Sequence, residues 1–464
     1  MAAKIPETLK FSWPDRTKLS AGAFWVVQTL QKNGFEALFA GGAVRDALLK
    51  RPIKEIDIAT NARPQAVQKI FARTIPTGLK HGTVTVREGG ESYEVTTFRV
   101  EGPYRDYRRP SKVTFVRSAA EDAVRRDFGI NALFYDVAKR AVVDYVGGIA
   151  DLSHRQVAFV GDSQSRIRED ALRMLRAVRF VTTLNFELAR EARKAIEKNA
   201  KLIRKISSER IKQELDRIIA SERVSVGFGT LDVVGLTEHI LPELHELQGV
   251  TQPRNLHSEG DVYAHTLLAL EKMDEGFDLP TRYAVLFHDM GKKKTRAVRD
   301  GRVTFYSHQT ESAAIAKKIC ERLKFSRQET DKIIWLVKNH MVPFDVAEMK
   351  LSTKRKWALH PYFADLLKLY AADNAASLRP SGKPNREPPG YREWQRVLRN
   401  LARQPEMKKP LLTGDEVMKI LKLKPGPDVG KVLKFLEEKK LAGKIKDKKA
   451  ALEFLKQKGT SVLN

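Results

Sequence analysis

A glycine pair followed by two closely spaced acids is the feature that most constrains this chain. Gly41 and Gly42 end an apolar run and open a predicted helix that carries Arg45. Glu55 and Asp57 follow at spacing two, so on a strand their side chains would point to the same face. Adjacent carboxylates repel unless a cation lies between them, and a glycine turn before a helix lets backbone N–H groups approach phosphate. Together these residues predict a site for Mg²⁺ and a nucleoside triphosphate.

Strand and helix signals alternate over the first 160 residues, and helical signals dominate after residue 165. Alternating β-branched residues predict strands at 82–87 and 93–99, and a charged stretch with glycine and proline predicts a mobile loop at 100–112. The fold class expected is therefore α+β. Apolar spacing predicts helices at 64–71, 122–133, 169–182, 189–203, 208–220, 263–274, 281–290, 311–323, 328–341 and 362–377.

The charge of the chain favours a polyanionic partner. Lysine and arginine number 84 against 57 acids, a net charge of +27. Because no apolar run reaches transmembrane length and no signal peptide is apparent at the start, nucleic acid is preferred to a membrane. Cys320 is the only cysteine, which excludes an internal disulfide and a cysteine-based zinc site and suits a cytoplasmic setting. The sequence leaves the oligomeric state open.

Further blocks follow the opening motif in a fixed order. They are Arg-Arg-Asp-Phe-Gly-Ile-Asn-Ala at 125–132, Asp-Tyr-Val-Gly-Gly-Ile-Ala-Asp-Leu at 144–152, and Glu-Asp-Ala-Leu-Arg-Met-Leu-Arg-Ala-Val-Arg-Phe at 169–180. Taken singly, a glycine pair is usually a tight turn and paired acids a solvated strand edge. As an ordered set over about the first 220 residues, the blocks resemble the class II tRNA nucleotidyltransferase and bacterial poly(A) polymerase family.

The resemblance implies metal-assisted nucleotidyl transfer from CTP and ATP without a template. Glu55 and Asp57 match the metal-binding pair of the family, although the family usually has Asp where this chain has Glu55. Glu94 is a further candidate for the catalytic carboxylates, with a plain strand-face charge as the equal alternative. The residues expected to contact the nucleotide are Gly42, Arg45, Arg126, Asp127, Asp170, Arg173, Arg176 and Arg179.

Asp170 and Arg173 carry the expected choice of base. At spacing three within the predicted helix, they are expected to share one face. A carboxylate accepts from an exocyclic amine and an arginine donates to a ring nitrogen or carbonyl, and adenine and cytosine both place an amine beside an acceptor. The resemblance implies that this pair reads ATP and CTP, with Arg176 and Arg179 reaching towards phosphates. The alternative is a basic, solvated helix.

Two segments favour tRNA as the polymer that is extended. Residues 75–84 resemble the tRNA enzymes of the family, and residues 104–110 resemble the flexible loop needed to add the terminal A. We therefore expect CCA addition to the 3′ end of tRNA. The alternatives are an A-adding enzyme, a poly(A) polymerase, or an RNA-binding phosphohydrolase whose transferase head is inactive.

Histidines and acids recur at helical positions after residue 260. Imidazoles and carboxylates from several helices can converge on one or two metal ions. The segment 286–292, Leu-Phe-His-Asp-Met-Gly-Lys, resembles the HD-type phosphohydrolase domain. The resemblance implies His265, His288, Asp289 and Asp373 as core ligands, and His308 and His340 as the extra ligands of two-metal members. A second divalent ion (Mn, Ni, Fe or Mg) and hydrolysis of cyclic or terminal phosphates are expected, and a structural relic is the alternative.

The lysine-rich end of the chain resembles the RNA-holding tail of long bacterial members. Gly426 and Gly430 suit a turn between helices whose backbone approaches phosphate, and 379–391 reads as a linker. Solvated amphipathic helices are the alternative. Four parts are thus predicted: a nucleotidyltransferase head at 1–160, a helical neck with the base-reading helix at 161–245, an HD-type domain at 246–380, and a linker with a basic RNA-binding tail at 381–464.

Overall fold

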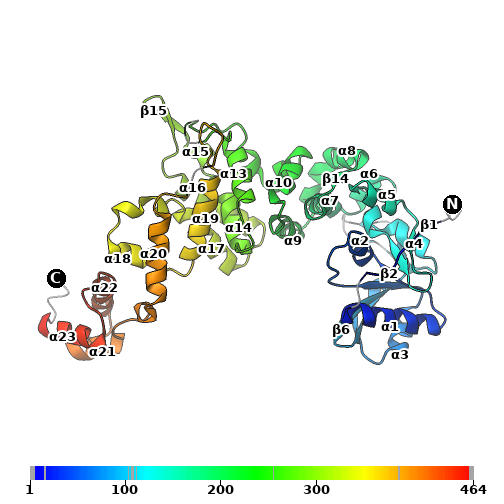
Figure 1. Ribbon diagram of the computed structural model, residues 1–464, viewed down its shortest axis with the longest axis horizontal. Coiled ribbons are helices and arrows are strands. Elements are labelled where there is room, and N and C mark those ends of the chain that lie inside the picture. Colours follow the sequence, from blue (N-terminus) through cyan, green and yellow to red (C-terminus); the bar gives the residue numbers. More distant parts are fainter. Residues whose placement is uncertain are drawn as a thin grey trace. The chain divides into compact units, whose positions relative to one another are not determined.

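The computed structural model describes residues 6–14, 17–102, 104–105, 109–110, 112–253, 255, 257–384 and 387–458, with only the backbone described at 104–105 and 109–110. The chain forms two compact units, Met1–Pro242 and Glu243–Asn464 (Figure 1). The α+β fold class is confirmed, because a mixed sheet occupies the first unit and helices fill most of the second. The finer division into four parts stays a prediction.

An eight-stranded sheet forms the body of the first unit, in the order β1-β12-β11-β2-β3-β6-β5-β4. β3 and β6 run parallel, and the other neighbours run antiparallel. The strands are β1 (Glu7–Lys10), β2 (Ala37–Ala40), β3 (Asp57–Thr60), β4 (Thr74–Gly78), β5 (Thr83–Glu88), β6 (Glu91–Thr97), β11 (Phe134–Asp136) and β12 (Ala141–Asp144).

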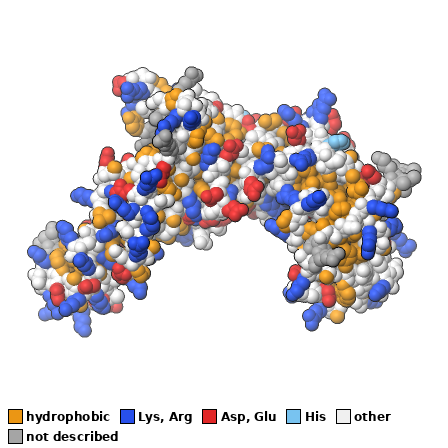
Figure 2. Space-filling model, viewed as in Figure 1, with side chains coloured by type: hydrophobic (Ala, Val, Ile, Leu, Met, Phe, Trp, Pro, Cys, Tyr) orange, Lys and Arg blue, Asp and Glu red, His pale blue; other side chains and the backbone are white. Residues whose placement is uncertain are grey.

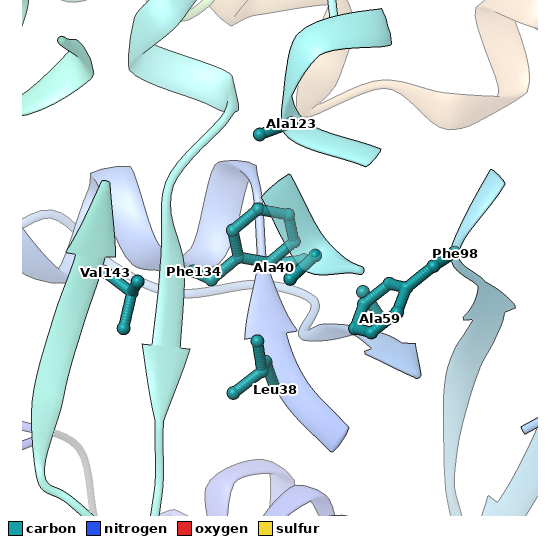
Figure 3. Close-up of a cluster of buried hydrophobic side chains, with 8 residues drawn as sticks. Leu38, Ala40, Ala59, Phe98, Ala123, Phe134 and Val143 are labelled. Atoms are coloured by element: carbon teal, nitrogen blue, oxygen red, sulfur yellow. The ribbon is translucent and has the colours of Figure 1, made fainter. Parts of the chain in front are cut away.

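Both faces of β2 are buried. Phe39 packs against Phe24 of α1 (Lys18–Lys32) on one face. Leu38 and Ala40 point to the opposite face, because side chains alternate along a strand. There they join a buried cluster with residues of β3, β11, β12 and α4 (Ala119–Arg125) (Figure 3). Burial of one Leu or Phe side chain contributes about 2 kcal/mol. This packing fixes the register in which Ala40, the last residue of β2, pairs with Asp57, the first residue of β3. The glycine turn and the acids therefore meet where these two strands end and begin.

Two predicted helices of the first unit are shorter than expected. The helix predicted at 122–133 ends at Arg125, and a 3₁₀ turn, Gly129–Asn131, follows. Between them Phe128 adopts an extended backbone (φ −128°, ψ 146°) and its ring packs against Phe159 and Phe180. Burial of this ring favours the extended backbone over a continued helix.

The predicted helix 169–182 is also interrupted, because two helices meet there. α6 (Ser163–Glu169) ends before Asp170, whose backbone is extended (φ −143°, ψ 104°), and α7 (Leu172–Leu184) begins after it. The carboxylate of Asp170 accepts a hydrogen bond from the backbone N–H of Leu172 at 3.1 Å. A side chain that bonds a nearby backbone N–H competes with helix continuation, which explains the break. The expectation that Asp170 and Arg173 share one helix is therefore wrong.

Short helices and ribbons complete the first unit. α1 and α3 (Pro64–Ile70) pack against the sheet, and α7 packs against α9 and α10 (Figure 1). Within the predicted mobile loop, 104–105 pairs antiparallel with 109–110, and residues 103, 106–108 and 111 lie outside the described part. The remaining elements are α2 (Gly42–Leu48), β7 (Arg99–Glu101), β10 (Val113–Phe115), α5 (Gly148–Ser153), β13 (Gln156–Val157), β14 (Glu187–Leu188), α8 (Arg190–Asn199), α9 (Ser208–Ile219), α10 (Val224–Val233) and α11 (Thr237–Ile240).

The second unit is mainly helical. The predicted helices at 263–274, 281–290, 311–323, 328–341 and 362–377 are all present with shifted ends, whereas a hairpin of β15 (Ala297–Arg299) and β16 (Arg302–Thr304) was not predicted. Among the described residues, no helix is both long and apolar enough to cross a membrane. The helices are α13 (Val262–Glu271), α14 (Leu279–Phe287), α15 (Lys292–Thr295), α16 (His308–Arg322), α17 (Arg327–Asn339), α18 (Leu351–Ala358), α19 (Phe363–Ala376), α20 (Tyr391–Ala402), α21 (Gly414–Leu421), α22 (Pro427–Leu441) and α23 (Lys448–Lys458).

Candidate nucleotide site and metal centre

The glycine turn after β2 places Arg45 at the end of that strand. Gly41 has a φ of +70°, a conformation that glycine adopts without strain, and a Cβ there would lie 3.1 Å from Nη1 of Arg126. Arg45 donates to Asp46 at 2.9 Å and to Oδ1 of Asn131 at 2.6 Å. The guanidinium groups of Arg45 and Arg126 therefore lie beside the glycine turn, whose backbone the sequence predicts to approach phosphate.

The predicted metal carboxylates converge beside this turn. Asp57 begins β3, and Glu55 lies in the coil before it, so strand alternation does not align the two. The pairing of Ile58 with Val95 brings Glu94 beside Asp57 on the neighbouring strand. Desolvation, with the charges of Glu55 and Glu94, raises the pKa of Asp57 to about 6, against the lowering effect of Arg126. A cluster of mutually repelling carboxylates is a fitting donor set for a divalent cation.

One cavity collects these groups. Every predicted nucleotide contact lines it together with Glu55 and Asp57, whereas Glu94 does not. Residues that the sequence reasoning did not assign also line it, among them Asn131, Phe180, Arg210 and Arg217. The cavity therefore combines acids with several arginines. Its lining is Gly41, Gly42, Arg45, Glu55, Asp57, Glu101, Arg125, Arg126, Asp127, Asn131, Asp170, Leu172, Arg173, Arg176, Arg179, Phe180, Arg210 and Arg217.

The two residues predicted to read the base both have fixed partners. Arg210 of α9 holds the carboxylate of Asp170 with both terminal nitrogens, at 2.7 and 3.3 Å. Arg173 pairs with Glu169 and donates to the backbone carbonyl of Arg166 at 2.8 Å. Arg210 was missed because it lies forty positions away on another helix, where a lone arginine gives no signal in the sequence.

The two arginines predicted to reach phosphates are paired with acids. Arg176 contacts Asp127 at 2.7 Å. Burial raises the pKa of Asp127, but Arg176, the charge of Arg173 and the backbone N–H of Phe128 together hold that pKa below its usual value. Arg179 lies 2.8 Å from Glu214 and 4.2 Å from the centroid of the Phe180 ring. Both arginines line the cavity, so their contact with phosphates stays a prediction.

The predicted HD ligands meet in the interior of the second unit. Nε2 of His265, on α13, lies 3.0 Å from Oδ1 of Asp373 on α19. Nε2 of His288 lies 3.2 Å from Oδ2 of Asp289 and 3.7 Å from Oδ1 of Asp373. His288 and Asp289 directly follow α14, so three helices supply this first group of ligands.

A second group of ligands shares Asp289. Its Oδ1 lies 3.4 Å from Nε2 of His308 and 4.0 Å from Nε2 of His340, and these two nitrogens lie 3.1 Å apart. Because Oδ2 of Asp289 faces the first group and Oδ1 the second, this carboxylate can bridge two ions. All the HD ligands predicted from the sequence are thus brought together, and we call the combined set the histidine centre.

The outer nitrogen of each histidine in the centre faces a hydrogen-bond acceptor. Nδ1 of His288, His308 and His340 lies within 2.9 Å of the carbonyl oxygens of Val285, Phe305 and Val337. Nδ1 of His265 lies 2.8 Å from Oε1 of Glu259, a residue that the sequence reasoning missed. Where Nδ1 carries the proton and the ring is neutral, Nε2 turns a lone pair inwards, as in metal-binding histidines. Burial lowers the pKa of His288, but the charges and hydrogen bonds of Asp289 and Asp373 raise it to about 10, so this ring must give up a proton when it binds a cation.

Orphaned atoms in the centre fit a metal ion. Nε2 of His288 is buried without a hydrogen-bond partner, and Oδ2 of Asp289, which lies 2.7 Å from Nζ of Lys292, accepts no well-aligned hydrogen bond. Burial and the neighbouring His288 and His308 lower the pKa of His340 to about 3, so its Nε2 stays unprotonated. Two facing lone pairs, such as those of His308 and His340, repel unless a cation lies between them. Among the described residues this donor set therefore suits one or two divalent ions.

Three family models match the chain. Residues 37–158 match the Poly A polymerase head domain, and residues 185–248 match a probable RNA and SrmB-binding site of polymerase A. Residues 303–455 match a putative domain 2 of tRNA nucleotidyltransferase. The sequence is also 36% identical over 432 residues to the CCA-adding enzyme of Levilactobacillus brevis, which covers 92% of this chain and 95% of the relative. The chain belongs to the CCA-adding enzyme family.

Further CCA-adding enzymes agree with this assignment. The enzyme of Anoxybacillus flavithermus is 50% identical over 222 residues, 48% of this chain and 55% of that one. The structure of the Bacillus stearothermophilus CCA-adding enzyme in complex with CTP matches with a TM-score of 0.70 at 29% identity, over 95% of this chain and 98% of that one. The Thermotoga maritima CCA-adding enzyme complexed with tRNA, at 17% identity and a TM-score of 0.56, shares the fold. The family expected from the motifs is confirmed, and the HD-type domain stays a prediction.

Proposed function

We propose that the head cavity adds C and A from CTP and ATP to the 3′ end of tRNA. The observation that carries this function is the meeting of acids, glycine turn and base-reading pair in one cavity of a CCA-adding enzyme. Lysine and arginine are spread over the surface of both units, as expected of a chain that binds RNA (Figure 2). Among alternatives, a poly(A) polymerase is disfavoured because the relatives are CCA-adding enzymes.

The chemistry requires a primer hydroxyl, a triphosphate and a divalent cation. The 3′-hydroxyl oxygen bonds to the α-phosphorus, the bond from that phosphorus to the bridging oxygen breaks, and pyrophosphate leaves as the hydroxyl loses its proton. Members of this family depend on a divalent metal, and we propose Mg²⁺ held by Glu55 and Asp57, with Glu94 in support. Arg45 and Arg126 then bind the triphosphate through charge-assisted hydrogen bonds.

Base choice follows from Asp170 and Arg173. An ionised Asp170 accepts from the exocyclic amine, and Arg173 donates to the neighbouring ring acceptor, an arrangement shared by adenine and cytosine. Uracil and guanine place a carbonyl where the amine is needed, so the half-buried carboxylate of Asp170 would face another acceptor. Such a mismatch costs about 1–3 kcal/mol.

Nucleotide incorporation on truncated tRNAs tests the proposal. Substrates that end before the first C, after C and after CC are incubated with each triphosphate alone and with CTP plus ATP. We expect C on the first two substrates and A on the third, and none from UTP or GTP. Addition of A without any C would show an A-adding enzyme, and failure on all three would reject transfer by this head.

The histidine centre supports a second function, hydrolysis of phosphate esters. A water oxygen would bond to phosphorus while the ester P–O bond breaks, and the leaving alcohol takes a proton. Metal analysis with a 2′,3′-cyclic-phosphate assay tests it. We expect bound metal and turnover in the wild type and loss of both in His288→Ala, whereas Asp57→Asn keeps both because that residue lies in the other unit. Equal turnover in wild type and His288→Ala would reject this function.

A further inference from the structure

A second cavity of the first unit lies apart from the nucleotide cavity. The elements around it are α1, α3 and the hairpin of β5 and β6, which pack together (Figure 1). Its volume is about 530 Å³, within the range of sites for small ligands. Among the described residues, none that lines it also lines the nucleotide cavity. A ligand bound here would therefore occupy a separate site, which we call the hairpin pocket.

One wall of the hairpin pocket is an exposed indole ring. Trp25 of α1 is 44% exposed, and its ring packs on the buried ring of Phe71, with centroids 5.6 Å apart and planes at 60°. The contact with Phe71 holds the indole in place, so little side-chain freedom is lost when a ligand binds. A fixed and exposed aromatic ring is a surface on which nucleobases stack.

Two arginines lie opposite one another on a second wall. Thr74 of β4 pairs with Val86 of β5, and the backbone N–H of Arg87 donates to the carbonyl of Arg73 at 2.9 Å. Side chains directly opposite on antiparallel strands lie on one face, where like charges are destabilising. Among the described residues, neither guanidinium group has a hydrogen-bond or ion-pair partner. Glu88 is the one acid among the lining residues, so positive charge is in excess.

The two walls together suit a phosphate that carries a base. An anion between Arg73 and Arg87 would relieve their repulsion and accept charge-assisted hydrogen bonds from both. Gly89 and Gly90 form the turn of the hairpin with φ of 59° and 88°, and they add no side chain to the pocket. Inorganic phosphate would gain nothing from Trp25, whereas a ligand with a base attached would contact both walls.

We propose that the hairpin pocket binds a nucleotide unit, with its base stacked on Trp25 and its phosphate between Arg73 and Arg87. The inference depends on neither the transfer reaction nor the histidine centre, because the pocket shares no described residue with them. The same chemistry is offered by a free nucleotide and by a nucleotide within single-stranded RNA.

Photolabelling of the full chain locates the bound base. The protein is irradiated with 8-azido-AMP and digested with trypsin, and the labelled peptides are identified by mass spectrometry. We expect label on peptide 19–32, which carries Trp25, and loss of this label when excess AMP is present. Label found only on other peptides, or label on 19–32 that AMP does not suppress, would overturn the proposal.

Binding of paired ligands tests the stack. Every sample carries Asp170→Ala and Arg173→Ala, so that binding in the nucleotide cavity is weakened. Calorimetry gives dissociation constants for AMP and for ribose 5-phosphate, which lacks the base. We expect AMP to bind about tenfold tighter, the order of one base–aromatic stack, and Trp25→Ala to abolish this difference while Trp25→Phe keeps most of it. An equal preference for AMP in Trp25→Ala would overturn the stack.

A matched pair of arginine variants tests the phosphate. Arg87→Gln should weaken AMP and ribose 5-phosphate alike, by about tenfold. Arg190→Gln, which removes an exposed arginine of α8 outside the pocket, should leave both constants unchanged. Without ligand, Arg87→Gln should raise the urea midpoint because the repulsion from Arg73 is removed, which also shows that the variant folds. Equal constants in the two variants would overturn the placement of the phosphate.

A short single-stranded oligoadenylate, measured alongside AMP, separates the two sources of the nucleotide. Tighter, Trp25-dependent binding of the oligoadenylate supports the pocket with RNA as its ligand. Tighter, Trp25-dependent binding of AMP supports it with a free nucleotide. Constants that neither Trp25→Ala nor Arg87→Gln changes, for either ligand, overturn the pocket.

Discussion

At the scale of single residues, Asp170, the acid that we propose to read the base, has a partner on another helix. Arg210 donates to both carboxylate oxygens of Asp170 and so would fix the direction in which this carboxylate meets a base. Hydrogen bonds to charged groups contribute about 1.5–3 kcal/mol. We expect Arg210→Gln to lower kcat/KM for CTP and ATP by about 10- to 100-fold. The ratio of these kcat/KM values to that for UTP should fall as well.

Arg217→Gln is the matched control, because Arg217 lines the same cavity but lies 3.8 Å from Glu214 with its side chain 58% exposed. Steady-state kinetics with each triphosphate on tRNA that lacks its end nucleotides check the effect. Equal selectivity in the Arg210 and Arg217 variants would contradict a positioning role for Arg210.

We expect Asp57 to give the transferase a pH dependence. Its pKa is raised to about 6 by desolvation and by the charges of Glu55 and Glu94, so the carboxyl is ionised above that pH and protonated below it. A protonated acid is a poor metal ligand. At subsaturating Mg²⁺ we expect activity to fall as pH drops from 7 to 5, and saturating Mg²⁺ to move this fall to lower pH. A profile that Mg²⁺ does not move would count against Asp57 as a metal ligand.

Substitutions of Glu55 test whether activity depends on its side chain, which is one methylene group longer than the usual Asp. It lies in the coil before β3 and is exposed, so the backbone does not hold it as a strand would. Glu55→Asp keeps a carboxylate that the coil can carry to the metal, and we expect activity within about tenfold of the wild type. Glu55→Ala should lose activity, and the incorporation assay measures both. Normal turnover in the alanine variant would leave Asp57 and Glu94 as the working pair.

At the scale of elements, glycines let the helices behind the base-reading pair pack closely. A Cβ on Gly227 of α10 would lie 2.6 Å from Ile218 and 2.8 Å from Thr182, residues of α9 and α7. A Cβ on Gly229 of the same helix meets no atom within 4 Å. Overpacking costs about 1–3 kcal/mol, and replacement of glycine by alanine in a helix gains about 0.5–1 kcal/mol.

We therefore expect Gly227→Ala to lower the free energy of unfolding and Gly229→Ala to raise it. Urea denaturation of both variants checks the signs, with CTP incorporation measured beside it. Because α9 carries Arg210, the Gly227 variant should also lose activity. Two variants of equal stability would show that α10 can move away from its neighbours at no cost.

The limits of prediction from sequence are clearest in these elements. The apolar spacing of 169–182 continues across Asp170, so periodicity alone does not reveal that its side chain accepts from the backbone N–H of Leu172, where a new helix begins. The β15–β16 hairpin did carry a signal, because Asp300 and Gly301 form an Asp-Gly turn with φ of 49° and 71°. The histidine ligands were recognisable by residue type. Their proton positions depend on carbonyls such as that of Val285, which only the fold places.

At the scale of the whole molecule, the excess of positive charge predicts how tRNA is held. The tail helices α21 to α23 form a hydrophobic cluster of their own, which includes Val417, Val432 and Leu455. Many of their lysines are exposed, and exposed lysines bind phosphates mainly by releasing counterions. Each phosphate that the tail no longer binds should therefore reduce the steepness with which salt weakens tRNA binding.

A triple variant tests the tail without altering its core. Lys444, Lys446 and Lys449 are exposed, and their replacement by Gln should weaken tRNA binding and lower the slope of log K against log salt by about one for each phosphate that is no longer bound. The control replaces Lys317, Lys318 and Lys338, exposed lysines of α16 and α17, which makes the same change in net charge. Filter binding at several salt concentrations measures both slopes. Equal slopes in the two variants would mean that net charge, and not the tail, attracts the tRNA. A smaller slope in the tail variant alone would place phosphate contacts on the connection between α22 and α23 and on the start of α23.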